Sequence, residues 1–309
     1  MNKRKIIIDT DPGIDDAVAL AIALFSEKLD TRLITTIAGN VSIEKVTKNI
    51  LKLLPFYGKK IPVAVGSARP LLAEPIDASG VHGKTGMDGY DFPEEDKSLL
   101  LEKNAVEAMY DVIMESDDKI TLVPIGPLTN IAILIRQYPE VKDKIDEVVL
   151  MGGSVSRGNA GVYSEFNIKA DPEAAKIVFE SGLNIVMAPL DVGLKALVYP
   201  EDSEIIKDMN KVGDMFYNLF KTYRGGSFKT GLKMYDSCAI AYLLKPEMFT
   251  IEETFVGIET KGEFTSGATC VDLRGYCGMP NNARVTLDID EAMFKEWFLE
   301  SIRNCVTDD

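Results

Sequence analysis

Short apolar runs alternate with segments of helical periodicity over roughly the first two thirds of the chain. The runs that predict strands are Lys5–Asp9, Arg32–Ile37, Ile61–Val65, Ile120–Ile125, Glu147–Met151 and Asn184–Ala188. The segments that predict helices are Asp15–Ser26, Ser42–Leu54, Ala105–Met114, Leu128–Tyr138 and Pro172–Ser181. This alternation is typical of right-handed βαβ units, which build an open, mostly parallel sheet with helices on both faces.

The last third of the chain departs from this alternation. Helices are predicted at Glu204–Tyr223, Asp236–Leu244 and Glu291–Asn304, and strands at Thr254–Glu259 and Ala268–Leu273. Within the early pattern, Pro62 cannot donate to a strand ladder, so it indicates an edge strand or a strand start. Since no linker, low-complexity tract or repeat divides the sequence, we expect one α/β domain over residues 1–309.

The charge of the chain limits its partners. The 309 residues carry a formal net charge of -14 and a pI of about 4.7. Nucleic acid and anionic membranes repel such a surface, so a small neutral substrate or a bound cation is the better match. No apolar run approaches a signal peptide or a membrane span. The four cysteines lack metal-site or disulfide spacing, which predicts free thiols in a cytoplasmic protein.

Four aspartates lie where the first predicted strand turns into the first predicted helix: Asp9, Asp11, Asp15 and Asp16. Such a group repels itself if it is buried without a positive partner. A hard divalent cation such as Ca²⁺, which takes 6–8 oxygen ligands, would neutralise it. The alternative is a solvated acidic helix start, but that leaves Asp9 and Asp11 unexplained at a buried strand end.

Further polar residues follow other predicted strands. They are Asn40, Asn130, Asn159, Glu165, Asn167 and Asp171, with Asp236 at the start of a late helix. Strand ends of a parallel sheet meet at one edge, so these groups are candidates for a single site. Amides and carboxylates bind sugar hydroxyls and cations, whereas turn chemistry is the alternative for each residue alone.

Phosphate chemistry is less well supported. Gly83-Lys84-Thr85 resembles the end of a P-loop, but Ala78 stands where that motif needs glycine. Asp9 and Asp11 also match the Asp-x-Asp of haloacid dehalogenase-like phosphatases. The continuation Pro12–Asp16 differs from that family, and no basic residue for the phosphate is evident. A phosphatase of this type remains an alternative.

The segment DTDPGIDDA resembles the fingerprint of the inosine–uridine-preferring nucleoside hydrolases. The resemblance continues through TTIAGNVSIEKVTKN, VHGKTGMDGYDF, VPIGPLTNIA, VVLMGGSVSRGNAGVYSEFNIKADPEAA and KGEFTSGATCVDLRG, and is greatest to bacterial non-specific ribonucleoside hydrolases. It implies a Rossmann-like fold, a homotetramer or homodimer, and a role in nucleoside salvage. The implied reaction is calcium-dependent hydrolysis of ribonucleosides, such as uridine, cytidine or inosine, to ribose and free base.

The resemblance also implies roles for individual residues. One Ca²⁺ per subunit would be held by Asp11, Asp16, Asp236 and the carbonyl of Ile125, and Asp11 would take a proton from the attacking water. The implied sugar contacts are Asp15 and Asn167 at the 2′-hydroxyl, Asp236 at the 3′-hydroxyl, and Asn159 and Glu165 at the 5′-hydroxyl, with Asn40 lining the pocket and Asp9 in support. A site built around the 2′-hydroxyl predicts a preference for ribose over deoxyribose.

One position departs from the family pattern. Many members have histidine before the aspartate at 236, where it protonates or adjoins the departing base, but this chain has Tyr235. Tyrosine, with a pKa near ~10 against ~6.5 for histidine, is the weaker acid at neutral pH. Tyr235 together with Tyr223 or Arg224, or the single histidine His82, are candidate substitutes. The remaining alternative is a nucleoside-binding protein that has lost hydrolysis.

Overall fold

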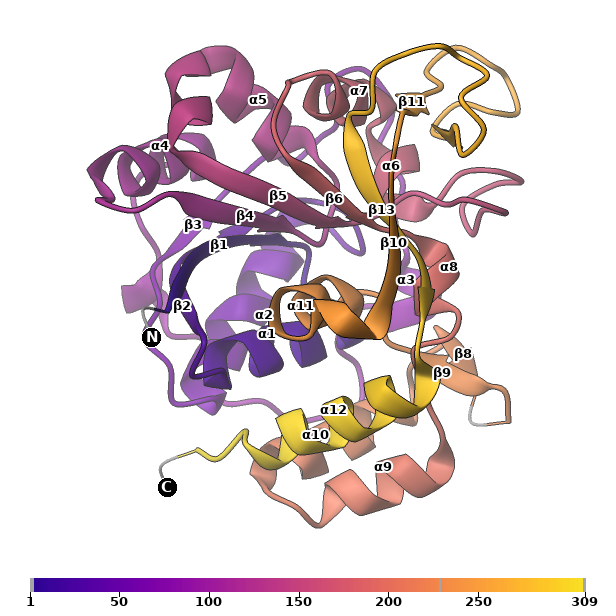
Figure 1. The fold of residues 1–309 in the computed structure, drawn as a ribbon. Coiled ribbons are helices and arrows are strands. Elements are labelled where there is room, and N and C mark those ends of the chain that lie inside the picture. Colours follow the sequence, from indigo (N-terminus) through magenta and orange to yellow (C-terminus); the bar gives the residue numbers. More distant parts are fainter. Residues whose placement is uncertain (1–2, 228, 308–309) are drawn as a thin grey trace.

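The computed structural model describes residues 3–227 and 229–307, and an eight-stranded sheet forms its centre. The strands lie in the order β10-β13-β6-β5-β4-β1-β2-β3 (Figure 1). Their bounds are β1 Arg4–Thr10, β2 Leu29–Thr36, β3 Val63–Val65, β4 Ile120–Pro124, β5 Ile145–Met151, β6 Ile185–Ala188, β10 Phe249–Thr254 and β13 Ala283–Ile289. Each neighbouring pair is parallel except β10 with β13.

The first six strands have the order 3-2-1-4-5-6, which is the doubly wound Rossmann order. The predicted open, mostly parallel α/β sheet is therefore confirmed. The chain moves outward from β1 in one direction through β2 and β3, and in the other through β4 to β6. The crevice between the carboxyl ends of β1 and β4 is thus the point where the winding reverses, and ligands bind at such points in this class of fold.

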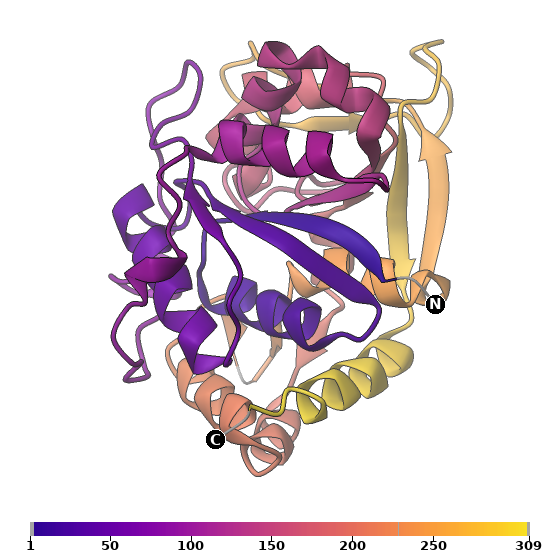
Figure 2. The ribbon, with the colours of Figure 1, turned by 90° about the vertical axis from the view of Figure 1, so that its left-hand side faces the viewer.

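Helices cover both faces of the sheet, as the alternating pattern predicted (Figures 1 and 2). One face carries α4 (Ala105–Glu115), α5 (Thr129–Gln137) and α7 (Pro172–Phe179). The other carries α1 (Ile14–Phe25), α2 (Ile43–Phe56) and α11 (Ser237–Leu244). Each layer seals a separate apolar core against the sheet. Among the described residues, no helix has the length and apolarity needed to cross a membrane.

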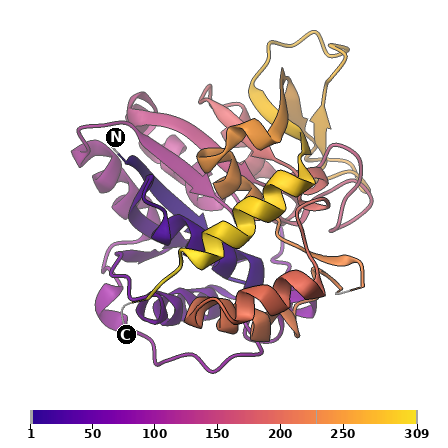
Figure 3. The ribbon, with the colours of Figure 1, turned by 60° about the horizontal axis from the view of Figure 1, so that its bottom comes forward.

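The expected long helix Glu204–Tyr223 is wrong, because the segment forms two helices, α9 (Pro200–Lys207) and α10 (Lys211–Phe220). Asn210 begins the second by accepting a hydrogen bond from the Gly213 N–H at 2.9 Å. A Cβ on Gly213 would lie 1.9 Å from the Ile206 carbonyl oxygen, so glycine permits the tight turn. The terminal helix α12 (Glu291–Arg303) packs on α1, α9 and α10 (Figure 3).

The strands of the last third also differ from expectation. β13 and β10 were not predicted, although they extend the main sheet beyond β6. The expected strand Thr254–Glu259 divides between the end of β10 and β11 (Val256–Ile258), which pairs with β12 (Thr269–Val271). A small sheet of β7 (Leu197–Val198), β8 (Gly226–Ser227) and β9 (Gly231–Lys233) was missed as well. Pro62 does precede an edge strand, β3.

The remaining short helices are α3 (Ser79–His82), α6 (Phe166–Ala170) and α8 (Leu190–Gly193), with 3-10 turns η1 (Lys97–Leu99), η2 (Pro139–Lys144) and η3 (Pro246–Met248). Two of them, α3 and α6, lie in the loops that follow β3 and β5. They bring His82 and Asn167 to the carboxyl edge of the sheet.

Candidate active site

The site forms where the loops after four neighbouring strands converge. Asp11 follows β1, Asn40 follows β2, and Ile125 follows β4. Glu165 and Asn167 belong to the loop and the short helix after β5. Because β1 and β4 pair in parallel with Asp9 opposite Pro124, the first and third of these loops leave the sheet side by side. Asn40, Glu165 and Asn167, predicted at separate strand ends, therefore share one location. Asp171 lies outside the cavity, because its carboxylate accepts from the Ala174 N–H at the start of α7 and from the Thr129 hydroxyl.

Asp16 is held at the first turn of α1. Its carboxylate accepts hydrogen bonds from the Thr10 hydroxyl at 2.7 Å and from the Gly13 backbone N–H at 2.9 Å. The second contact satisfies the backbone N–H of Gly13, the N-cap residue of the helix, where the helix dipole also favours negative charge. Asp16 is thus oriented by the same local sequence that begins the helix.

Asn40 ties the loop after β2 to the acidic turn. Its backbone N–H donates to Asp11 Oδ2 at 2.7 Å, and its side-chain amide donates to Asp16 Oδ2 at 3.0 Å. Asp11 fits closely between two glycines. A Cβ on Gly39 would lie 2.1 Å from Asp11 Oδ2, and one on Gly126 would lie 2.6 Å from Oδ1. Asp11 is thereby enclosed by the loops that follow β2 and β4.

Asp9 lies beneath this layer at the end of β1. Its Oδ1 accepts hydrogen bonds from the Thr35 hydroxyl at 2.6 Å and from the Asn130 amide at 2.8 Å. Burial raises the pKa of Asp9 to about 7. Asn130, from the start of α5, also accepts a hydrogen bond from the Ser67 N–H. The Asp9 carboxylate therefore links β1 to β2 through Thr35 and to α5 through Asn130.

Four buried carboxylates form the floor of the site: Asp11, Asp15, Asp16 and Asp236. Burial raises the pKa of each carboxyl group; that of Asp15 rises to about 8, with a further contribution from the charge of Asp16. Asp236 reaches the group from the start of α11, far along the chain. Burial and the charges of Asp15, Asp16 and Asp11 raise its pKa well above the ordinary value.

The donor set of this floor fits a hard cation. Carboxylate oxygens of Asp15, Asp16 and Asp236 lie within 4.8 Å of one another. Asp11 is outside that group, although the charge of Asp16 acts on it. Within the described residues, Asp11 Oδ1 and Asp9 Oδ2 are buried without a hydrogen-bond partner. Crowded oxygen ligands with unmet charge are the arrangement that Ca²⁺ or a similar ion stabilises.

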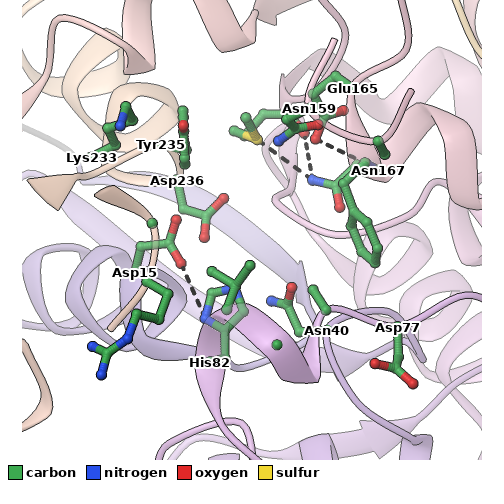
Figure 4. A pocket seen from close by; sticks show the side chains of 18 of the residues that line it. Asp15, Asn40, Asp77, His82, Asn159, Glu165, Asn167, Lys233, Tyr235 and Asp236 are labelled. Carbon is green, nitrogen blue, oxygen red and sulfur yellow. Dashed lines mark hydrogen bonds and ion pairs between the residues drawn. The ribbon is translucent and has the colours of Figure 1, made fainter. Parts of the chain in front are cut away.

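A cavity of about 580 Å³ opens above the carboxylates (Figure 4). The predicted site residues that line it are Asp15, Asn40, His82, Ile125, Asn159, Glu165, Asn167, Tyr223, Arg224, Tyr235 and Asp236. The other two, Asp11 and Asp16, are buried in the floor with exposed fractions of 1% and 0%. The structure therefore brings all thirteen predicted residues to one place.

The loop after β5 supplies one wall of the cavity. Glu165 begins α6 by accepting from the Asn167 N–H at 2.9 Å, and it also accepts from the Gly153 N–H at 2.9 Å. Burial raises the pKa of Glu165 to about 7. The Asn167 amide donates to the carbonyls of Ile125 and Met151, both at 3.1 Å, which leaves its oxygen as an acceptor. Asn159 is exposed at the rim.

His82 is buried in α3 and does not face solvent. Its Nδ1 accepts a hydrogen bond from the Ile14 N–H at 3.1 Å and lies 3.8 Å from Asp15 Oδ1. Burial lowers the pKa of His82 to about 4. The ring is therefore a neutral imidazole with its proton on Nε2, packed beside Tyr223 at a centroid distance of 5.5 Å. It is a hydrogen-bond donor near the site and not an imidazolium acid.

The residues proposed to replace the missing histidine are largely committed to other contacts. The Tyr223 hydroxyl donates to the Lys233 carbonyl at 3.0 Å. Arg224 donates to the carbonyls of residues 221–223 at the end of α10. Tyr235 is half-buried against Gly193, and burial with the nearby charge of Asp15 raises its pKa. Tyr235 is therefore a weaker acid than an ordinary tyrosine.

The cavity also has lining residues that sequence analysis missed. They are Ile76, Asp77, Ala78, Gly80, Val81, Met151, Ala160, Phe166, Lys169, Gly225, Gly226 and Lys233. For Lys233 a signal existed, because it lies two residues before Tyr235 and alternate residues of an extended segment share a face. The others lie in loops, in the short elements α3, α6 and β8 or at the end of β5, where the local sequence gives no signal for a cavity.

An open Rossmann-like sheet with an acidic cavity at its switch point, lined by carboxylate and amide groups, is the architecture expected of a nucleoside hydrolase, and comparison with known proteins assigns the chain to that class. Residues 6–296 match the family model described as "Inosine-uridine preferring nucleoside hydrolase". The chain belongs to this family and is a hydrolase that acts on N-glycosyl bonds.

Sequence relatives and solved structures agree with this assignment. The non-specific ribonucleoside hydrolase RihC of Escherichia coli is 51% identical over 96% of this chain and 97% of its own length. Its Salmonella paratyphi C counterpart is 52% identical over 96% of both chains. The purine-preferring ribonucleoside hydrolase from Gardnerella vaginalis superposes with a TM-score of 0.90 at 28% identity, covering 98% of this chain and 99% of its own.

Proposed function

We propose that this chain hydrolyses the N-glycosidic bond of ribonucleosides, such as uridine, cytidine and inosine, to ribose and free base. The observation that carries the proposal is the single cavity that joins a buried carboxylate cluster to a ring of hydroxyl-binding side chains. The names of the bacterial relatives, non-specific ribonucleoside hydrolases, support the same substrate class.

The ribose would lie over the floor of the cavity. We assign the 2′-hydroxyl to Asp15 and Asn167, the 3′-hydroxyl to Asp236, and the 5′-hydroxyl to Asn159 and Glu165. Asp15, Asp236 and the free oxygen of Asn167 are acceptors, which suit hydroxyl donors. Contacts to hydroxyls remote from the base can hold the sugar in a distorted conformation that favours bond cleavage.

Ca²⁺ would be held by Asp11, Asp16, Asp236 and the Ile125 carbonyl, with Asp15 close by. When bound, the ion would offset the negative charge of the floor and lower the pKa of a water molecule. The Ile125 carbonyl already accepts a hydrogen bond from Asn167, so ion and sugar contacts share this residue.

Asp11 is proposed as the base that takes a proton from the attacking water. Its Oδ2 is held by the Asn40 N–H, while its Oδ1 has no partner within the described residues and is available to accept the proton. Cleavage passes through an oxocarbenium-like state, as in glycoside hydrolysis. The carboxylates of Asp15 and Asp236 would stabilise the positive charge that develops on the ribose ring.

The first test is ribose release, measured by a reducing-sugar assay with uridine, cytidine, inosine and adenosine. We expect release in Ca²⁺, its loss after EDTA, and its return when Ca²⁺ is restored. Nucleoside binding without any release would instead identify a binding protein. Phosphate release from phosphorylated substrates in Mg²⁺ would support the phosphatase alternative, which the family assignment does not favour.

Gly39→Ala tests the placement of Asp11. The added Cβ would lie 2.1 Å from Asp11 Oδ2 and 2.9 Å from the Pro127 ring, so the carboxylate must move. We expect turnover to fall by at least about tenfold, since displacements near 1 Å impair catalysis strongly. Gly257→Ala is the control, because the first contact of its Cβ is the edge of the Phe255 ring at 3.3 Å, outside the site. Equal turnover in both variants would contradict the assigned position.

A further inference from the structure

One wall of the cavity carries a lysine, Lys233, that has no role in the proposed contacts to the ribose or the metal ion. Lys233 ends β9 and lines the cavity beside Tyr235 (Figure 4). The hydroxyl-binding residues Glu165 and Asn167 lie in a different part of the cavity, on the loop that follows β5. The lysine side chain is partly buried, so it belongs to the cavity wall and not to the open surface.

The backbone around Lys233 is held on both sides, and the ammonium lies close to Gly226. Its N–H donates to the Gly225 carbonyl at 2.9 Å, and its own carbonyl accepts from the Tyr223 hydroxyl at 3.0 Å. Gly226 adopts a φ of +136°, and a Cβ there would lie 3.2 Å from Lys233 Nζ. The ammonium therefore lies directly against the Gly226 backbone, where any other residue would crowd it.

The electrostatic surroundings of Lys233 are unusual for a lysine of this chain. Burial, followed by the positive charge of Arg157, lowers its pKa. Two lysines that pair closely with a carboxylate show the opposite shift: Lys195 beside Asp288 and Lys295 beside Asp202, both pairs at 2.6 Å, have raised pKa values. The charge of Lys233 is thus left for an electron-rich ligand in the cavity.

We propose that the Lys233 ammonium hydrogen-bonds the departing base and stabilises the negative charge that the base acquires. This inference rests on the proposed nucleoside hydrolysis and supplies its leaving-group interaction. The water oxygen bonds to C1′ and its proton passes to Asp11, while the C1′–N bond breaks and its electron pair goes to the base nitrogen. The base leaves as an anion that accepts a hydrogen bond from Nζ and takes a proton from solvent. Lys233 remains charged throughout.

The competing donors on this wall are less available. The Tyr223 hydroxyl already donates to the Lys233 carbonyl, and Arg224 Nη1 donates to three carbonyls at the end of α10. An ammonium offers three donors and no acceptor. It therefore suits bases that present a carbonyl oxygen or a ring nitrogen that becomes anionic, such as uracil and hypoxanthine.

The test compares Lys233→Met on two substrates that differ in their leaving group. Uracil needs stabilisation as it departs from uridine, whereas p-nitrophenolate, released from p-nitrophenyl β-D-ribofuranoside, is already a stable anion near neutral pH. Removing one preorganised donor costs about 10²–10³ in kcat at an enclosed site, so for this partly buried group we expect a loss of about tenfold to a hundredfold on uridine. Activity on the nitrophenyl riboside should stay within about threefold, which also shows that the variant is folded.

Two further variants complete the design. Lys233→Arg keeps the positive charge and the donors and should restore most of the activity on uridine. Lys229→Met removes an exposed lysine of the same hairpin and should leave both substrates unaffected. If Lys233→Met loses the same activity on both substrates, or loses none on either, Lys233 has no leaving-group role. Neither result would contradict the proposed hydrolysis. If the unaltered enzyme cleaves only the nitrophenyl riboside, the leaving-group role is also overturned. If it cleaves neither, the proposed function fails with it.

Discussion

Asp11→Asn is expected to reduce ribose release from uridine by about 10³-fold or more, because it removes both the general base and a negative charge of the floor. The substitution keeps the shape of a side chain that is enclosed by Gly39 and Gly126. The asparagine oxygen can still accept from the Asn40 N–H, which now contacts Oδ2 at 2.7 Å. The loss should therefore be chemical and not structural.

Stability provides the independent check for this variant. Burial and the charge of Asp16 raise the pKa of Asp11, so the neutral amide should not lower the unfolding temperature in EDTA. The rise in unfolding temperature that Ca²⁺ produces should become smaller, because a ligand of the ion is lost. Asp143→Asn, at an exposed position, is the matched control. Undiminished turnover of Asp11→Asn would exclude this carboxylate from the mechanism.

Uridine is expected to exceed 2′-deoxyuridine in kcat/KM by about 10⁴, since a site built to bond a hydroxyl rejects the analogue that lacks it. The Asp15 carboxylate is buried in the floor, and both donors of the Asn167 amide are used by the Ile125 and Met151 carbonyls. Without the 2′-hydroxyl, Asp15 and the Asn167 oxygen would face the deoxyribose carbon without a donor. The direction is informative because the deoxyribosyl cation forms more easily in solution.

Asp15→Asn shows whether this residue causes the discrimination. The variant should lose activity on uridine much more than on 2′-deoxyuridine, so that the ratio of the two kcat/KM values falls. Steady-state rates for both substrates, measured with the same assay in Ca²⁺, give this ratio directly. A ratio below about tenfold in the unaltered enzyme would contradict the assignment of the 2′-hydroxyl to Asp15 and Asn167.

Much of the fold and of the site could be predicted from the sequence because the relevant signals are local. Apolar runs and helical periodicity located β1, β2, β4, β5 and β6 and the helices between them. The cluster Asp9–Asp16 indicated several buried carboxylates close together in the sequence. The contacts that orient Asp16, from the Thr10 hydroxyl and the Gly13 N–H, come from the same short segment. Polar residues after successive strands indicated one shared edge, which the parallel pairing confirms.

Other features depend on partners that are distant in sequence. The segment Ala283–Ile289 becomes β13 because it pairs with β6 on one side and β10 on the other, and neither contact leaves a local pattern. Burial keeps His82 neutral by lowering its pKa, and the hydrogen bond from the Ile14 N–H to Nδ1 leaves the proton on Nε2. Lys233 is positioned in the site by its contacts with Gly225, Gly226 and Tyr223, and the periodicity of the sequence does not reveal these contacts.

The sequence by itself thus determined the class of sheet and the acidic turn, and family resemblance supplied the candidate site residues. The roles of these residues, the calcium ion, the oligomeric state, the compartment and the preferred base stay predictions. Tertiary structure decided which carboxylates share the floor, bringing Asp236 beside Asp15 and Asp16 from more than two hundred residues away. It also decided which polar groups are already satisfied and which remain available for a ligand. The physical reason is that periodicity and capping act over a few residues, whereas burial and charge at the site come from elements that only folding brings together.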